Sequence, residues 1–320
     1  MIIRTPTPSD IPSIVSLLKI SLGESLLPKS EAYWKWKHVD NPFGVSPVLL
    51  AEENSELVGV RAFMQWRWTD GEQQFRAVRA VDTATHPDHQ GKGIFRKLTL
   101  QLVEECRRDG VSFIFNTPNS KSKPGYLKMG WVEAGKVSIR LSPVSIANIV
   151  SNVLRSGVRS PAPEVQSMEF EDSEVRHLLD TNRRFRVGIG TDVNMAYLDW
   201  RYRQVPGIKY LFFSFREAQL TTVIIGRIKS SKLGNEFRVT DCFSAERVIP
   251  RKCRREFRKF VKRNGGDFIT ASDHVGERLL MGLNFRVGPS TTVNLLDFPH
   301  PEKLLSFGNW NPSLGDLELF

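Results

Sequence analysis

The feature that most constrains the fold is a strand, a glycine turn, a helix and a second strand within residues 75–115. Phe75–Thr85 mixes β-branched and small residues, and Pro87 ends strand pairing. After Gly91 and Gly93, apolar residues recur at helical spacing: Ile94, Phe95, Leu98, Leu102 and Cys106. Gly110 falls where this helix would end, and residues 111–115 have the pattern of a short buried strand. This alternation predicts an α/β unit.

The glycine turn has the composition of a phosphate site. Gly91 and Gly93 let the backbone approach a ligand closely, and the helix that follows offers unpaired N–H groups to an anion. A Walker loop is excluded because Lys92 lies between the glycines and Ile94 replaces the hydroxyl residue. A dinucleotide fold is excluded because Arg96 stands at its third glycine.

The turn resembles the acyl-CoA loop of the GCN5-related N-acetyltransferases (GNATs), whose pattern is Gln/Arg-x-x-Gly-x-Gly/Ala. Gln90, Gly93 and Phe95 match its positions, although Phe95 stands where the family has a small residue. The resemblance implies that residues of the turn bind the pyrophosphate of acetyl-CoA, namely Gln90, Gly91, Lys92, Gly93, Ile94 and Phe95.

More GNAT features follow in the family's order. Asn119, Tyr126, Gly130 and Trp131 match an Asn, a Tyr seven residues later and a Gly-aromatic pair. By resemblance, Asn119 holds the CoA arm and Tyr126 protonates the departing thiolate. A phenol, with an ordinary pKa of about 10, is a suitable proton donor to a thiolate. The alternative is that Tyr126 is only a half-buried aromatic of a helix.

The resemblance also gives the strand a role. Thr83, Ala84 and Thr85 are expected to splay from the neighbouring strand at a bulge and to offer main-chain N–H groups to pantetheine and to the acetyl oxygen. Asp82 is the candidate general base. The competing interpretation pairs Asp82 with Arg79 or Arg61, or leaves it in solvent. His86 and His89 carry no assigned role.

Length and composition favour two domains and give no sign of a membrane span or a metal site. The 320 residues exceed the length of one acetyltransferase domain and suit two domains of common size. No apolar run approaches the roughly 20 residues of a membrane span, and the N-terminus lacks the layout of a signal peptide. The three cysteines, Cys106, Cys242 and Cys253, have no metal-ligand spacing. The expected setting is the cytoplasm.

The second half of the chain echoes the first. Residues 33–37 (YWKWK) return as 197–202 (YLDWRY), residues 107–114 return as 262–269, and 128–131 (KMGW) returns as 280–283 (LMGL). The second copy lacks the glycine turn, and Arg278 falls at the position of Tyr126. We therefore expect an N-terminal catalytic domain at residues 1–160 and a degenerate C-terminal copy with a tail at 161–320. The Pro-rich stretch around residue 160 is the expected linker.

The expected fold is α/β (α+β), with two tandem GNAT-like domains, each a mixed, mostly antiparallel sheet flanked by helices. The expected reaction moves an acetyl group from acetyl-CoA directly to an amine of a small-molecule, amino-sugar or peptide acceptor. Two alternatives are an aminoacyl-tRNA-dependent, Fem-like aminoacyltransferase and a non-catalytic CoA-binding module. Nucleic acid is an unlikely partner because the basic residues of 251–263 alternate with an apolar stripe, which is typical of a solvated helix face. The acceptor and the oligomeric state stay open.

Overall fold

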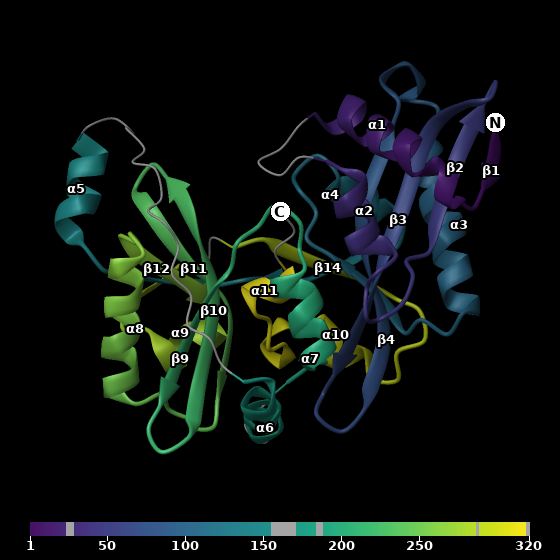
Figure 1. The fold of residues 1–320 in the computed structure, drawn as a ribbon. Coiled ribbons are helices and arrows are strands. Elements are labelled where there is room, and N and C mark those ends of the chain that lie inside the picture. Colours follow the sequence, from purple (N-terminus) through teal and green to yellow (C-terminus); the bar gives the residue numbers. More distant parts are fainter. Residues whose placement is uncertain (24–28, 155–170, 184–187, 286–287, 318–320) are drawn as a thin grey trace.

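The fold consists of two halves, each built on a β-sheet with helices against it (Figure 1). The computed structural model describes residues 1–23, 29–154, 171–183, 188–285 and 288–317. The halves lie side by side, and the expected linker around residue 160 lies outside the described residues.

The first sheet contains, among the described residues, eight strands. Its order is β1 (Ile2–Arg4), β2 (Val48–Glu53), β3 (Glu56–Thr69), β4 (Gln74–Thr85), β5 (Phe113–Asn116), β14 (Ser290–Leu295) and β6 (Val132–Lys136), with β8 (Gly190–Thr191) paired to β3. Neighbours are antiparallel, except that β4 and β5 are parallel. The sheet is therefore mixed and mostly antiparallel, as expected.

Helices cover both faces of this sheet. They are α1 (Ile11–Leu22), α2 (Glu31–His38), α3 (Ile94–Arg108) and α4 (Lys123–Lys128), with short 3-10 turns at Pro8–Asp10 and Pro87–His89. The predicted apolar stripe of α3 packs on the sheet through Ile94, Leu98, Leu102 and Cys106, all buried. Gly110 follows α3 with a φ of 73°, which explains why glycine stands where the helix ends.

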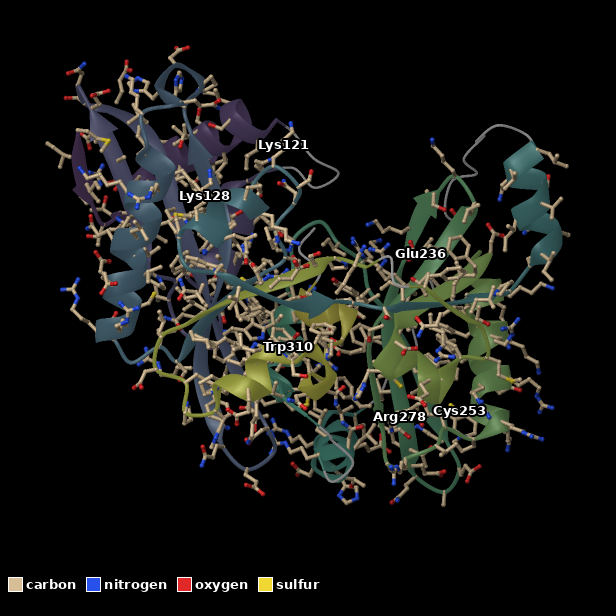
Figure 2. The ribbon with its side chains drawn as sticks, turned by 180° about the vertical axis from the view of Figure 1, so that it is seen from behind. Lys121, Lys128, Glu236, Cys253, Arg278 and Trp310 are labelled. Carbon is tan, nitrogen blue, oxygen red and sulfur yellow. The ribbon has the colours of Figure 1, made fainter. Side chains whose placement is uncertain are left out.

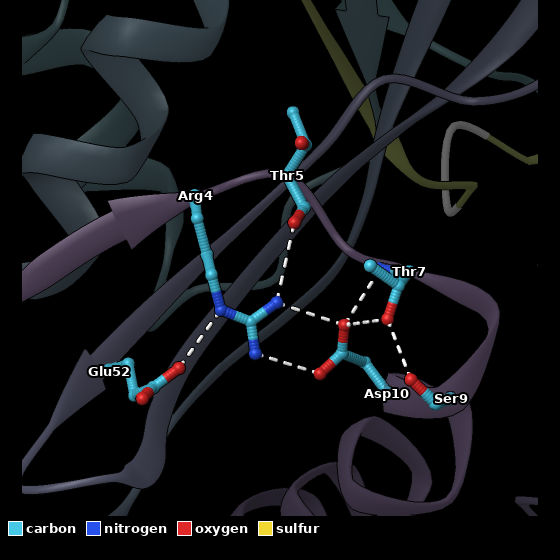
Figure 3. A network of polar contacts seen from close by, with 6 residues as sticks. All are labelled: Arg4, Thr5, Thr7, Ser9, Asp10 and Glu52. Atoms are coloured by element: carbon cyan, nitrogen blue, oxygen red, sulfur yellow. Dashed lines mark hydrogen bonds and ion pairs between the residues drawn. The ribbon is translucent and has the colours of Figure 1, made fainter.

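A polar network joins the edge strand β1 to the start of α1 (Figure 3). The guanidinium of Arg4 donates to Asp10 Oδ1 at 2.7 Å and to Glu52 Oε2 on β2 at 2.9 Å. The hydrogen bond from Arg4 holds the pKa of Asp10 well below its usual range. The network fixes the edge of the sheet to the helix that covers it.

The second sheet has, within the described part of the chain, six strands. Its order is β13 (Leu283–Phe285), β7 (Ile139–Pro143), β12 (Phe268–Ser272), β11 (Gly234–Ser244), β10 (Leu220–Ser231) and β9 (Leu211–Arg216). The accompanying helices are α5 (Ile146–Leu154), α6 (Asp172–Arg183), α7 (Met195–Leu198), a π-helical turn at Asp199–Arg203, α8 (Arg251–Arg263) and α9 (Asp273–Leu279). The parallel pair β11 and β12, joined through α8, repeats the arrangement of β4, α3 and β5.

The predicted echo of residues 33–37 in 197–202 is visible as a symmetric contact between the copies. The indole of Trp36 donates to the carbonyl oxygen of Trp200, and the indole of Trp200 donates to that of Trp36, both at 2.7 Å. The two rings stack with centroids 4.8 Å apart. A contact in which equivalent residues meet each other is the signature of a two-fold interface.

The copies also exchange strands, which a division at residue 160 does not anticipate. β7 precedes that position but lies in the second sheet, between β12 and β13. β14 follows it but lies in the first sheet, between β5 and β6. Each sheet is therefore completed by a strand from the other half of the chain.

The C-terminal segment packs between the halves. It contains α10 (Pro301–Leu305), a 3-10 turn at Phe307–Asn309 and α11 (Leu314–Leu317). Trp310 and Leu317 are buried in the largest core, and Figure 2 shows Trp310 between the two halves. The ring of Trp310 meets that of Trp68 on β3 edge-on. Leu319 and Phe320 lie outside the described residues.

Candidate active site

Strand β4 leaves its parallel neighbour at the predicted place. β5 pairs with β4 only at Ala77, Val78 and Arg79, whereas β4 continues along β3 as far as Thr85. The two parallel strands therefore splay apart beyond Arg79. Thr83, Ala84 and Thr85 lie on the free part of β4, so backbone groups on that side face the gap rather than a strand.

A β-bulge at Asp82 accompanies the splay. Thr83 pairs with Arg61 and Val81 with Ala62, which leaves Asp82 as the extra residue, with a φ of 38°. Positive φ is costly for a residue other than glycine, so the surrounding structure must hold this conformation. The bulge turns the Asp82 side chain toward α2.

Asp82 pairs with Lys37 and His38 of α2, and not with Arg79 or Arg61. Its Oδ2 atom lies 2.7 Å from Lys37 Nζ and 2.8 Å from His38 Nε2, and its side chain is 23% exposed. Burial alone would raise the pKa of Asp82, but the Lys37 charge and the His38 hydrogen bond outweigh it and hold that pKa well below its usual range. Burial lowers the pKa of His38 despite the carboxylate. Asp82 is therefore ionised at neutral pH and is a weak base.

Tyr126 is buried on α4, and its phenol oxygen accepts a hydrogen bond from Arg61 Nη2 at 2.7 Å. Arg61, on β3, is itself fully buried. Its Cζ atom lies 4.7–5.6 Å from the ring centroids of Phe63, Phe95 and Tyr126. Its Nε atom has no hydrogen-bond partner among the described residues. Sequence reasoning did not assign Arg61 to Tyr126; a charged residue within the apolar run of β3 was the available signal.

The glycine turn is open to solvent at the start of α3. Gly91 and Gly93 have φ angles of 78° and 75°, and Gly93 caps the helix, with Gly91, Lys92 and Gly93 exposed. The ring of Phe95 points inward, 5.7 Å from the ring of Tyr126 and against Gly125. The bulky residue at the family's small position therefore packs between α3 and α4 and leaves the backbone of the turn exposed.

The remaining predicted residues lie nearby. Asn119 precedes α4, and its Oδ1 accepts hydrogen bonds from the backbone N–H groups of Lys121 and Ser122. Gln90 is exposed beside the turn, and Ile94 is buried in the first turn of α3. Lys92, the lysine of the glycine turn, has a carboxylate neighbour: its Nζ atom lies 3.5 Å from Glu53 Oε2.

A cavity of about 870 Å³ lies where the two halves meet. The first half contributes Asp82, Thr83, Asn119 and Tyr126 to its walls. Glu236 of β11 lies on the opposite wall, at the boundary between the halves in Figure 2, with its carboxylate 2.9 Å from Arg238. The residues of the glycine turn are not among those that line this cavity, whereas the predicted CoA-site residues Thr83 and Asn119 are.

The equivalent gap in the second copy is bridged. Arg278 of α9, at the position of Tyr126, donates to the backbone carbonyls of Arg247 and Glu246 at 3.1 and 2.8 Å. These carbonyls belong to the loop that replaces the glycine turn. The guanidinium thus ties α9 to this loop.

Neither a metal cluster nor a membrane-spanning helix occurs in the described residues. Within these ranges, no group of three or more His, Cys, Asp or Glu side chains is arranged to hold a metal ion. No helix in them is both long and apolar enough to cross a membrane.

Part of the chain is similar in sequence to known acetyltransferases. Residues 2–134 match the family model of the acetyltransferase (GNAT) domain. Over 64 residues the chain is 45% identical to the L-amino acid N-acyltransferase MnaT of Escherichia coli and to an L-methionine sulfoximine/L-methionine sulfone acetyltransferase of Salmonella typhimurium. Each match covers 20% of this chain and 36% of the relative, so the chain spans about a third of the length of these curated proteins.

Solved structures resemble the whole chain. A GCN5-related N-acetyltransferase from Anabaena variabilis has a TM-score of 0.66 at 14% identity, covering 92% of this chain and 73% of its own. A probable N-acyltransferase from Enterococcus faecalis has a TM-score of 0.65 at 10% identity, covering 94% and 74%. At these identities the likeness shows the fold, here of both halves together. The family model, in turn, matches the GNAT acetyltransferase domain within the first half, over residues 2–134.

Proposed function

We propose that the chain transfers an acetyl group from acetyl-CoA directly to an amine held in the cavity between the two halves. The observation that carries the proposal is the convergence of three elements on Tyr126: the splayed end of β4, the first turn of α3 and the cavity. A direct transfer of this kind needs the two substrates held together, and it needs no covalent enzyme intermediate.

The donor side uses the exposed backbone of the glycine turn. N–H groups of Gly91, Lys92, Gly93 and Ile94 bind the pyrophosphate, since the start of a fifteen-residue helix offers unpaired donors and a positive dipole end. Gln90 and Asn119 flank the CoA arm, and Phe95 supports it from below. The inward position of the Phe95 ring supports this assignment.

The acetyl carbonyl lies in the gap beside β4. Main-chain N–H groups of the stretch Thr83–Thr85 that face this gap bind the pantetheine and stabilise the oxyanion of the tetrahedral intermediate, a role for which donors fixed in a strand are well suited. As the C–S bond breaks, the Tyr126 hydroxyl gives its proton to the CoA sulfur. Arg61 holds the phenol oxygen in place and offsets the negative charge left on it.

The acceptor binds on the Asp82 side. Because Asp82 is ionised and has a low pKa, it takes a proton only weakly, so we propose that the amine reaches it largely neutral and passes its proton to water or to Asp82 during attack. The names of the two curated relatives make amino acids the first acceptors to test.

A CoA-release assay over a panel of amines tests the proposal. Amino acids, amino sugars, polyamines and peptides should be compared, with products identified by mass spectrometry. Tyr126→Phe should lower turnover on the best acceptor at least tenfold, because general acid catalysis contributes about 10²- to 10⁴-fold. Calorimetric acetyl-CoA affinity should change little, because the phenol lies away from the pyrophosphate.

Two results would contradict the proposal in different ways. Unchanged turnover in Tyr126→Phe removes Tyr126 from the reaction and leaves acetyl transfer standing. Retained acetyl-CoA binding with no turnover on any amine instead supports the non-catalytic CoA-binding module.

A further inference from the structure

Helix α8 of the second half carries an unusually basic outer face. Eight of its thirteen residues are lysine or arginine, and Glu256 is its only acid. Its apolar side chains, Cys253, Phe257, Phe260 and Val261, are buried against the sheet. Glu256 lies within 4 Å of Arg255 and Lys259, which leaves a strong positive excess on the exposed side.

The neighbouring helix α5 is amphipathic in the opposite sense. Most of its apolar residues face solvent, with Ile146 68%, Val150 50%, Val153 56% and Leu154 78% exposed, whereas Ile149 is half-buried. Its polar side faces the protein, where Asn148 Nδ2 donates to Asp267 Oδ1 at 2.8 Å. None of its residues is buried and none is charged. A surface helix normally buries its apolar stripe, so an outward stripe marks a surface that contacts something else.

The two helices form one surface. Arg258 of α8 donates to Ser142 Oγ at 2.9 Å and to the carbonyl of Pro143, at the end of the strand that leads into α5. Asp267, just after α8, accepts from Asn148 and from the backbone N–H of Ser145. Both helices lie at the outer edge of the second half, away from the first half (Figure 1). We call these two helices the α5–α8 surface.

We propose that the α5–α8 surface docks the protein on an anionic lipid bilayer. The apolar side of α5 enters the headgroup region, and the bases of α8 lie along the anionic headgroups, which is the pairing that peripheral membrane helices use. A nucleic acid would satisfy the charge of α8 but would gain nothing from the apolar side of α5. A second copy of this chain would bring the two basic helices close together and repel.

Vesicle co-sedimentation tests this surface directly. The intact protein should bind phosphatidylcholine vesicles that contain phosphatidylglycerol, should bind pure phosphatidylcholine only weakly, and should dissociate with added NaCl. Lys252→Gln/Lys262→Gln should lower the partition coefficient about 25-fold, at about fivefold per basic residue. The matched variant Lys35→Gln/Arg108→Gln removes the same charge from exposed positions of the first half and should bind as the wild type does.

The apolar contribution needs its own variant. Val150→Gln/Val153→Gln keeps the charge of α5, does not lower its helix propensity, and should lower partitioning at least about tenfold at low salt. An unchanged thermal melting temperature shows that the variant folds. Absence of binding to anionic vesicles would overturn the proposal. Vesicle binding by the α5 variant equal to that of the wild type, together with tight tRNA binding through α8, would instead assign the surface to nucleic acid. A concentration-dependent dimer that the α5 variant abolishes would assign it to a second copy of the chain.

Discussion

At the scale of single residues, Arg61 is the group whose position the motif could not indicate. Motif spacing pointed to Tyr126, but the contact between the two depends on the packing of α4 against β3. A buried guanidinium beside a phenol oxygen stabilises the phenolate left by proton transfer, as charged donors do at developing anions. No motif indicated the contacts of Lys37 and His38 with Asp82 either, because they form only where a bulge turns the Asp82 side chain toward α2.

Arg61→Met should therefore lower turnover in the CoA-release assay roughly tenfold to a hundredfold, with little change in the KM for acetyl-CoA. Methionine has a similar length and removes the charge, so the buried site stays filled. In a Tyr126→Phe background the same change should cost little more, because Arg61 acts through the Tyr126 oxygen. Additive losses in the double variant would show that Arg61 acts independently of Tyr126.

At the scale of elements, the strand, turn and helix of residues 74–116 lie where the sequence predicted them, because glycines and a proline fix their ends. The docking of α11 on β11 had no such local signal. Where α11 meets β11, the carboxylate of Asp241 accepts a hydrogen bond from the Tyr202 hydroxyl and lies beside Gly315 of the tail. Burial, reinforced by the nearby charge of Asp316, raises the pKa of Asp241 to about 7.

This raised pKa predicts how stability changes with pH. The folded state binds the Asp241 proton more tightly than the unfolded state, so its contribution is complete at acid pH and is lost as the pH rises toward 7. Asp241→Asn keeps the hydrogen bond but removes the titration. Between pH 5 and pH 8 the wild type should therefore lose roughly 2 kcal/mol of unfolding free energy, measured in urea, that the Asp241→Asn variant does not lose. Parallel pH profiles for the two proteins would assign the titration elsewhere.

At the scale of the whole molecule, sequence echoes predicted two copies of one fold but not the exchange of their last strands. β7 and β14 are both short strands of mixed polar and apolar residues, so composition does not assign either strand to one sheet. The choice is made by tertiary pairing: β6 pairs only with β14 in the described chain, and β13 only with β7. The result is an intramolecular analogue of a strand-swapped dimer, with Trp36 and Trp200 at its centre.

The exchange predicts that the chain cannot be cut at residue 160 into independent domains. Residues 1–160 alone lack β14, which would leave β6 detached and the edge of β5 unpaired, so this fragment should be insoluble or lack a cooperative melt. Coexpressed with residues 161–320, it should copurify as a complex. Fusing residues 288–297 to the fragment through a flexible linker should restore solubility by filling the same place, where Val293 is fully buried. A soluble, cooperatively melting fragment 1–160 would instead show that its sheet closes without the exchanged strand.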